Sequence, residues 1–275
     1  MNIKFVVNDY ILVWNLLFRA SISEPIHKLK QKLWTNYKDE YNETYNDKTL
    51  MLRDIKNYIP NDDTIYNLVL ETKEYEKLKK ETEKYRLEIL KVWDKRLNTY
   101  LKKILKKEPK EYTIFLVNEE FDVLETIKLG EQITVILGKK VTKENYRKLM
   151  VDIIMSIVKK ELKEYTNDNE RFIAAAIIEM AIYNELATNL TNNSHYFMGK
   201  EKFTYIKRQV YPYWLMYLGI KKEDMQKYMS RDKIAFDLEK YPYEKQLIDY
   251  GLEEFIDFCL KYKRYMIKEE NLELI

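Results

Sequence analysis

The chain has 275 residues, and its 46% hydrophobic and 34% charged content is that of a globular protein rather than a disordered one. Its net charge of +3 is the small difference between 48 basic and 45 acidic residues, which gives no support to a nucleic-acid-binding protein. A single cysteine excludes a disulfide framework and a thiolate metal cage, and only five glycines and five prolines argue against an all-β fold.

The N-terminal segment predicts an intracellular protein. Its apolar run is interrupted by Lys4, Asn8, Asp9 and Asn15, and no small-residue cleavage site follows. No apolar stretch reaches the roughly 18–20 residues that span a bilayer. The heavy use of Lys, Asn, Ile and Tyr is typical of an AT-rich bacterial genome. We therefore expect a bacterial, cytoplasmic protein.

Residues 1–110 are predicted to form a helical N-terminal lobe. Apolar residues at three- and four-residue spacing indicate an amphipathic helix over 26–45 and a longer one over 64–107, which ends before Pro109. Opposite charges three and four residues apart on the second segment suit the solvated face of a long helix.

The next segment carries the sheet. Residues 112–117 and 132–137 are rich in β-branched residues and are followed by Asn118 and Gly138, as strands are. A weaker strand is expected over 121–127. The connection is too short for a crossover helix, so we predict a small antiparallel sheet.

Helices are expected again over 143–165 and 169–190, in a segment that ends near Tyr217, and over 224–230 and 243–262. The fold class is therefore mainly α (α+β): a helical N-terminal lobe, a small antiparallel sheet and a helical C-terminal half. The change of texture near residue 111 predicts domains 1–110 and 111–275, or two lobes of a single domain 1–275.

Two consecutive apolar helices each carry an embedded carboxylate. Residues 149–158 are apolar except for Asp152 and Ser156, which lie four apart on one face. Residues 172–183 are apolar except for Glu179 and the hydroxyl of Tyr183. A buried carboxylate is costly unless it is paired, so the pattern predicts a polar cluster of Asp152, Ser156, Glu179 and Tyr183.

The order of two strands, a helix and a second helix with an embedded glutamate resembles the core of zincin metallopeptidases, over about residues 112–190. In that family the first helix carries His-Glu-x-x-His. Asp152 and Ser156 stand at the two histidine positions, and Ile153 stands at that of the catalytic glutamate. Glu179, followed by the small Ala181, resembles the third zinc ligand. The resemblance implies a zincin-like core.

The departures from the family pattern remove the residues that bind zinc and act as general base. Zinc requires about three good ligands, and both motif histidines and the general base are missing. His195 is the one weak candidate ligand, because it follows the Glu179 helix. No Gly-rich phosphate loop is present. We therefore expect no metal and no cofactor, and a non-enzymatic protein rather than a peptidase.

The leading hypothesis is a zincin-like scaffold without catalytic metal that acts through a protein partner or self-association, with no membrane role. Alternatives remain open. Asp152 and Glu179 could be structural, each paired with a residue such as Arg208 or Tyr213, or could serve an enzyme without zinc. The lysines at 102, 103, 106, 107 and 110 suit either a helix C-terminus or, less well, nucleic acid. The aromatic run 210–219 fits a packed core or a stacking platform.

Overall fold

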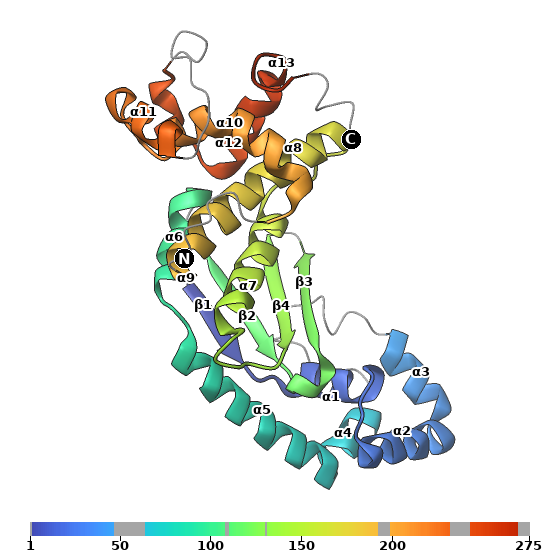
Figure 1. The fold of residues 1–275 in the computed structure, drawn as a ribbon. Coiled ribbons are helices and arrows are strands. Elements are labelled where there is room, and N and C mark those ends of the chain that lie inside the picture. The colour runs from blue at the N-terminus through green and yellow to red at the C-terminus, as the bar shows by residue number, and fades with distance from the viewer. Residues whose placement is uncertain are drawn as a thin grey trace. The chain divides into compact units, whose positions relative to one another are not determined.

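The computed structural model describes residues 2–46, 64–107, 110–129, 131–191, 199–231 and 243–268 (Figure 1). The backbone groups into two compact units. The first comprises Met1–Lys95 and Lys110–Lys160, and the second comprises Arg96–Pro109 and Glu161–Ile275. The two sections of each unit alternate along the chain, whereas the sequence suggested a boundary near residue 111.

The first unit contains a four-stranded sheet with the order β1-β2-β4-β3. β1 pairs with β2 and β2 with β4 in parallel, whereas β3 and β4 are antiparallel. The strands are β1 (Asn2–Val6), β2 (Glu111–Leu116), β3 (Val123–Leu129) and β4 (Gln132–Gly138).

The expectation of an antiparallel sheet is wrong, because the sheet is mixed. The connection between β2 and β4 needs no crossover helix, since it contains β3 itself. After β2, the short 3-10 helix η2 (Glu119–Phe121) leads to β3 at the edge, and a hairpin then returns β4 between them in the direction of β2. The prediction of a wholly helical segment 1–110 is also corrected, because β1 was missed.

Among the described residues of the first unit, the helices before β2 are α1 (Asp9–Phe18), α2 (Glu24–Asn36), α3 (Lys38–Asn46), α4 (Thr64–Leu70) and α5 (Lys73–Val92). The segment expected as one long helix is interrupted twice. The Thr72 side chain accepts a hydrogen bond from Tyr75 N and caps α5. α5 ends where Trp93 adopts an extended conformation, before α6 (Arg96–Leu105) begins.

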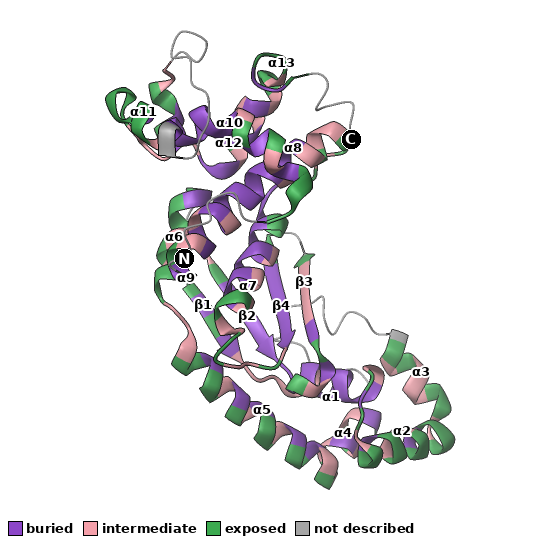
Figure 2. Ribbon diagram, in the orientation of Figure 1, coloured by how far each residue is buried: buried purple, intermediate pink, exposed green. Residues whose placement is uncertain are grey.

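Side chains of the sheet are buried on both of its faces. Phe115, Val117 and Ile136 belong to a core cluster that includes residues of α1, α4 and α5. Tyr112 and Ile114 alternate with these positions and are also fully buried. Helix α7 (Tyr146–Glu161) runs alongside β2 and β4, and the strands near it are mostly buried (Figures 1 and 2).

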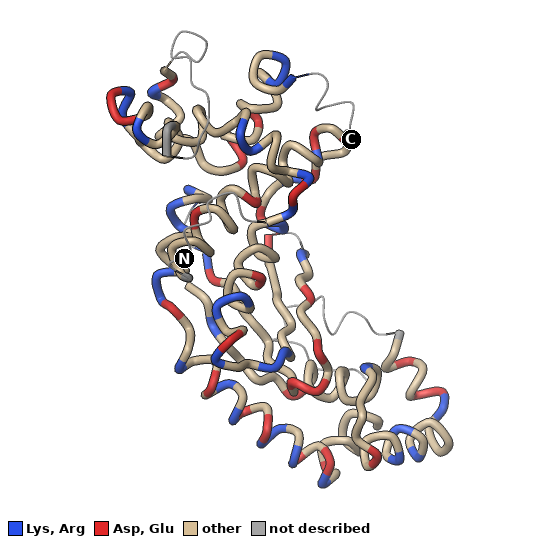
Figure 3. The backbone as a smooth tube through the Cα atoms, in the orientation of Figure 1, with Lys and Arg blue, Asp and Glu red and all other residues tan. Residues whose placement is uncertain are grey.

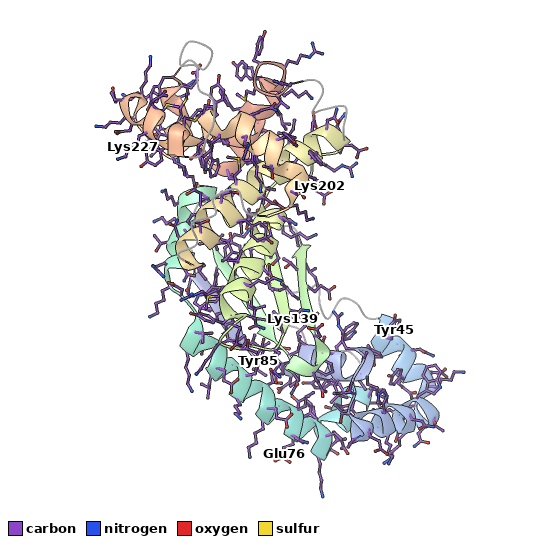
Figure 4. All side chains as sticks on the ribbon, viewed as in Figure 1. Tyr45, Glu76, Tyr85, Lys139, Lys202 and Lys227 are labelled. Carbon is purple, nitrogen blue, oxygen red and sulfur yellow. The ribbon has the colours of Figure 1, made fainter. Side chains whose placement is uncertain are left out.

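One hydroxyl group joins α5 to the end of β4. The Tyr85 hydroxyl donates to the Lys139 carbonyl oxygen at 2.6 Å and accepts from the Lys139 backbone N–H at 3.1 Å. Both residues are labelled in Figure 4. The side chain therefore satisfies both backbone groups of the first residue after the strand, and burial raises the pKa of this phenol.

The second unit is helical throughout its described part. Gly219 has a φ of 83° and follows the end of α10 (Thr204–Tyr217), and its N–H donates to Met216 O. Besides α6, its elements are α8 (Asp168–Glu179), the π-helix η3 (Met180–Ala187), α9 (Thr188–Thr191), η4 (Glu201–Phe203), α10 (Thr204–Tyr217), α11 (Lys222–Arg231), η5 (Lys245–Asp249), α12 (Leu252–Lys261) and α13 (Lys263–Met266).

Aromatic rings form much of this unit's core. Trp214 contacts Tyr217 with ring centroids 5.0 Å apart, and Phe255 of α12 lies 5.6 Å from Trp214. All three are buried, which confirms the interpretation of the aromatic run as core. Cys259 is also fully buried, and burial raises the pKa of its thiol, so it is not a reactive cysteine. Across the described residues, no helix is both long and apolar enough to cross a bilayer.

Candidate functional site

Asp152 and Ser156 lie on one partly exposed face of α7. Their neighbours Ile153 and Ile157 are buried, whereas Asp152 and Ser156 are half-buried. The Ser156 hydroxyl donates to the Ile153 carbonyl oxygen at 2.8 Å, within its own helix. The helix therefore satisfies this hydroxyl internally.

Glu179, the last residue of α8, is paired with a lysine in the second unit. Its Oε2 accepts a hydrogen bond from Lys207 Nζ at 3.0 Å and another from the Lys200 backbone N–H at 3.0 Å. Lys207 is 0% exposed and Glu179 only 5%. Burial lowers the pKa of Lys207, although the ion pair with Glu179 opposes this.

The backbone at Gly199 packs against this ion pair. Its φ is 98°, in the left-handed region that favours glycine. A Cβ at this position would collide with Glu179 Oε2 and lie 3.1 Å from Lys207 Nζ. The backbone at 199–200 thus approaches the carboxylate as closely as glycine allows and delivers an N–H to it.

The helical segment that directly follows Glu179 is a π-helix. Immediately after Glu179, η3 continues α8 with the wider turn. Tyr100 of α6 donates a hydrogen bond to the Ala181 carbonyl oxygen, and Thr188 donates to the Tyr183 carbonyl oxygen at 3.3 Å. The side-chain amide of Asn184 is fully buried and has no hydrogen-bond partner within the described part of the chain. Such widened turns occur often at functional sites.

The expected four-residue cluster is divided between the two units. Asp152 and Ser156 belong to the first, and Glu179 and Tyr183 to the second. Within the second unit, Glu179 pairs with Lys207 of α10, and Glu185 of η3 pairs with Trp214 of the same helix. Trp214 Nε1 donates to Glu185 Oε1 at 2.9 Å.

Metal ligands are scarce in the described part of the chain. There, no three His, Cys, Asp or Glu side chains are grouped so that they could hold a metal ion. His195 lies outside the described residues. His27 Nε2 is 2.5 Å from the Ser21 carbonyl oxygen in the first unit.

The lysine cluster at the end of α6 makes contacts within each unit. Lys107 Nζ lies 3.7 Å from Glu161 and 3.8 Å from Glu253, and Lys106 Nζ donates to the Ile248 carbonyl oxygen. Lys110 stands over the Tyr112 ring at 6.0 Å in the first unit. Lys102 and Lys103 lie in the last turn of α6, where they complement the helix C-terminus.

Sequence inspection identified the carboxylate but not its cation. In the sequence Lys207 resembles a surface lysine, and the partners named as examples were Arg208 and Tyr213. Lys207 lies between Ile206 and Val210, both buried, and this apolar spacing is the signal that could have found it. No family model matches the chain, and neither the curated proteins nor the solved structures contain a match to it.

Proposed function

We propose that this protein is a non-catalytic, zincin-like scaffold that holds no metal and acts by binding another protein chain. The observation that carries the metal-free part is the ion pair of Glu179 with the fully buried Lys207. Glu179 is the residue that the resemblance places as a zinc ligand, and it already has a fixed cation.

The ion pair gives Glu179 a structural task. A buried carboxylate needs a counter-charge and hydrogen bonds, and Lys207 and the Lys200 N–H supply both. The same two donors occupy Oε2, and Gly199 packs against it, so this oxygen is closed to a substrate. The arrangement favours structure over acid–base chemistry with Glu179.

A surface on the first unit supports the protein-binding part of the proposal. We call it the aromatic surface: Trp34 and Tyr45, which are 43% and 47% exposed. Tyr45 contacts Phe18 at 5.1 Å, and Phe18 and Trp34 both contact Tyr41, at 5.1 and 5.6 Å. Exposed rings held by packed ones are typical of protein interfaces.

The occupant we propose for the aromatic surface is a second copy of this chain. The 48 basic and 45 acidic residues nearly cancel, so two copies do not repel each other strongly. Burying the two large exposed rings against a partner removes apolar area from water and so favours association.

The metal-free part is tested by equilibrating the purified chain with excess Zn²⁺, removing free metal by gel filtration and measuring bound zinc. We expect no retained zinc and the same melting temperature with Zn²⁺ and with EDTA. One zinc per chain that is lost in Glu179→Gln would overturn the proposal.

The interaction part is tested by sedimentation equilibrium over a wide concentration range. We expect self-association that weakens strongly in Trp34→Ser. The matched control is Leu87→Ser, which removes a 52% exposed apolar side chain elsewhere in the same unit. A monomer at every concentration, or equal weakening by both variants, would contradict it.

A further inference from the structure

We propose that the second unit binds single-stranded nucleic acid through a surface of basic and tyrosine side chains. This surface, the basic–tyrosine surface, consists of Lys202, Tyr205, Arg208, Arg264, Tyr265 and Lys268, all of which are exposed. It belongs to the second unit, whereas the aromatic surface belongs to the first, and it does not depend on the function proposed above.

Two chain segments meet at this surface. Residues 201–209 form η4 and the start of α10, and residues 261–268 end α12 and form α13. They are joined where the Lys268 backbone N–H donates to Gln209 Oε1 at 2.8 Å. On α10, Tyr205 and Arg208 lie within one turn of Gln209, so they border the second segment.

The local charge differs sharply from that of the whole chain. Residues 261–268 contain Lys261, Lys263, Arg264 and Lys268 and no acidic residue, and Glu269 and Glu270 follow directly in the sequence. Glu201 is the sole acidic residue from 199 to 217, so basic residues remain in excess over the two segments. Figure 3 shows part of α13 in the colour of Lys and Arg. On neighbouring α8, Asp168 is paired with Arg171 at 2.9 Å. The nearly neutral total therefore conceals a local basic excess, which attracts polyanions.

The exposed rings distinguish the ligand. Tyr205 is 67% exposed and Tyr265 is 81% exposed, and a basic residue lies within one helical turn of each. Unpaired bases stack on such rings while the phosphates meet the cations. The bases of a duplex are already stacked on each other, so an exposed ring favours a single strand.

The same segment is poorly suited to a membrane surface. Its aliphatic residues Met266 and Ile267 are only 4% and 2% exposed and face the protein core. A helix that binds bilayers needs a large apolar face directed outward. Lys202, labelled in Figure 4, stands over the Phe172 and Phe203 rings at 5.4 and 5.1 Å, so its position is fixed by packing.

The test is fluorescence anisotropy of the full chain with fluorescein-labelled oligo(U) and oligo(dT) at low salt. We expect binding that weakens with salt by about 0.7 logarithmic units per logarithmic unit of salt for each phosphate contacted. Tyr265→Ala should weaken binding roughly fivefold to a hundredfold through lost stacking, and Arg264→Glu with Lys268→Glu should lower the salt slope.

Two controls make the test specific. Tyr146→Ala removes a partly exposed tyrosine of the first unit, and Lys102→Glu with Lys103→Glu reverses two charges at the end of α6. Circular dichroism confirms that each variant is folded. No binding at low salt, equal loss in the controls, or binding to phosphatidylserine vesicles without binding to either oligonucleotide would each overturn the proposal.

Discussion

The buried ion pair of Glu179 and Lys207 joins the end of α8 to α10, and it stabilises the fold only while both partners are present. We predict that Glu179→Leu alone destabilises the protein by about 3–5 kcal/mol, because it leaves the ammonium of a 0% exposed lysine without its carboxylate. The double variant Glu179→Leu, Lys207→Met should recover much of this loss. Urea unfolding of the single and double variants measures the coupling, and simple additivity would show that the pair is not coupled.

Gly199 is a second sensitive residue, since it combines a positive φ with close contact to the ion pair. Gly199→Ala should destabilise the protein by roughly 1–3 kcal/mol, from backbone strain and collision with the carboxylate. Lys200→Ala is the control, because it keeps the backbone N–H that Glu179 accepts. Thermal unfolding of the two variants measures the difference, and an equal effect would argue against a tight approach at Gly199.

Tyr85 offers a test in the first unit. Tyr85→Phe leaves the N–H and carbonyl of Lys139 without their shared partner, and we predict a loss of about 1–3 kcal/mol in the free energy of unfolding. Tyr45→Phe removes the hydroxyl from a 47% exposed ring and should change stability little. Equal urea midpoints for the two variants would contradict the role assigned to this hydroxyl.

For individual residues, the sequence predicted which side chains are buried better than it predicted which side chains pair with each other. Glu179 stood out because apolar residues surround it on a helix. Its partner did not stand out, because Lys207 and Arg208 are both basic, and the sequence does not show that Lys207 is buried whereas Arg208 is exposed. One residue turns a helix by about 100°, and the register of α10 against α8 decides which of them meets Glu179. That register is set by tertiary packing.

At the element scale, Asp9 joins the start of α1 to α5. It accepts a hydrogen bond from the Tyr75 hydroxyl at 2.7 Å and lies 2.8 Å from Lys79 Nζ. Burial alone would raise the pKa of Asp9, but the hydrogen bonds from Lys79 and Tyr75 outweigh it, and the pKa lies below its ordinary value.

This lowered pKa predicts a pH dependence. The folded state holds the Asp9 carboxylate more favourably than the unfolded chain, so its contribution is fully present above the unfolded pKa of about 3.9 and is lost as pH falls through the lower folded pKa. The stability difference between the wild-type chain and Asp9→Asn should therefore shrink as pH falls below 4. A difference that stays constant from pH 7 to pH 2.5, measured by urea unfolding, would refute this.

Local signals predicted most elements but not their pairing. β4 was predicted from its β-branched run, and α7 and α8 lie where helices were predicted over 143–165 and 169–190. β1 was missed because NIKFV is short and precedes an apolar helix, and its partner β2 lies more than 100 residues away. The break after Trp93 contains neither Gly nor Pro, so no residue type signals the end of α5, and the sequence predicted one long helix across it. Of the candidate site, the sequence identified Glu179. It did not identify Lys207 or Gly199, because their contacts with Glu179 depend on tertiary structure.

At the scale of the whole molecule, each unit is built from two separate sections of the chain, and it can be tested whether the first unit folds without the second. Residues 1–95 joined to 110–160 by a Gly/Ser linker of about 12 residues contain all of the first unit. We predict that this chain unfolds cooperatively in urea. Residues 1–110 alone lack β2, β3 and β4 and should not. Cooperative folding of 1–110 would instead support the boundary suggested by the sequence.

The pairing of β1 with β2 also has a consequence for biosynthesis. Asn2 lies opposite Glu111, so the strand made first waits at the ribosome until more than 100 further residues have been added. At about 5–20 residues per second, this delay lasts on the order of 5–20 seconds. During that time Ile3 and Phe5, which are buried in the finished sheet, have no strand to pair with. Nascent chains halted before residue 111 should therefore present this segment to chaperones, and chains halted beyond β4 should not.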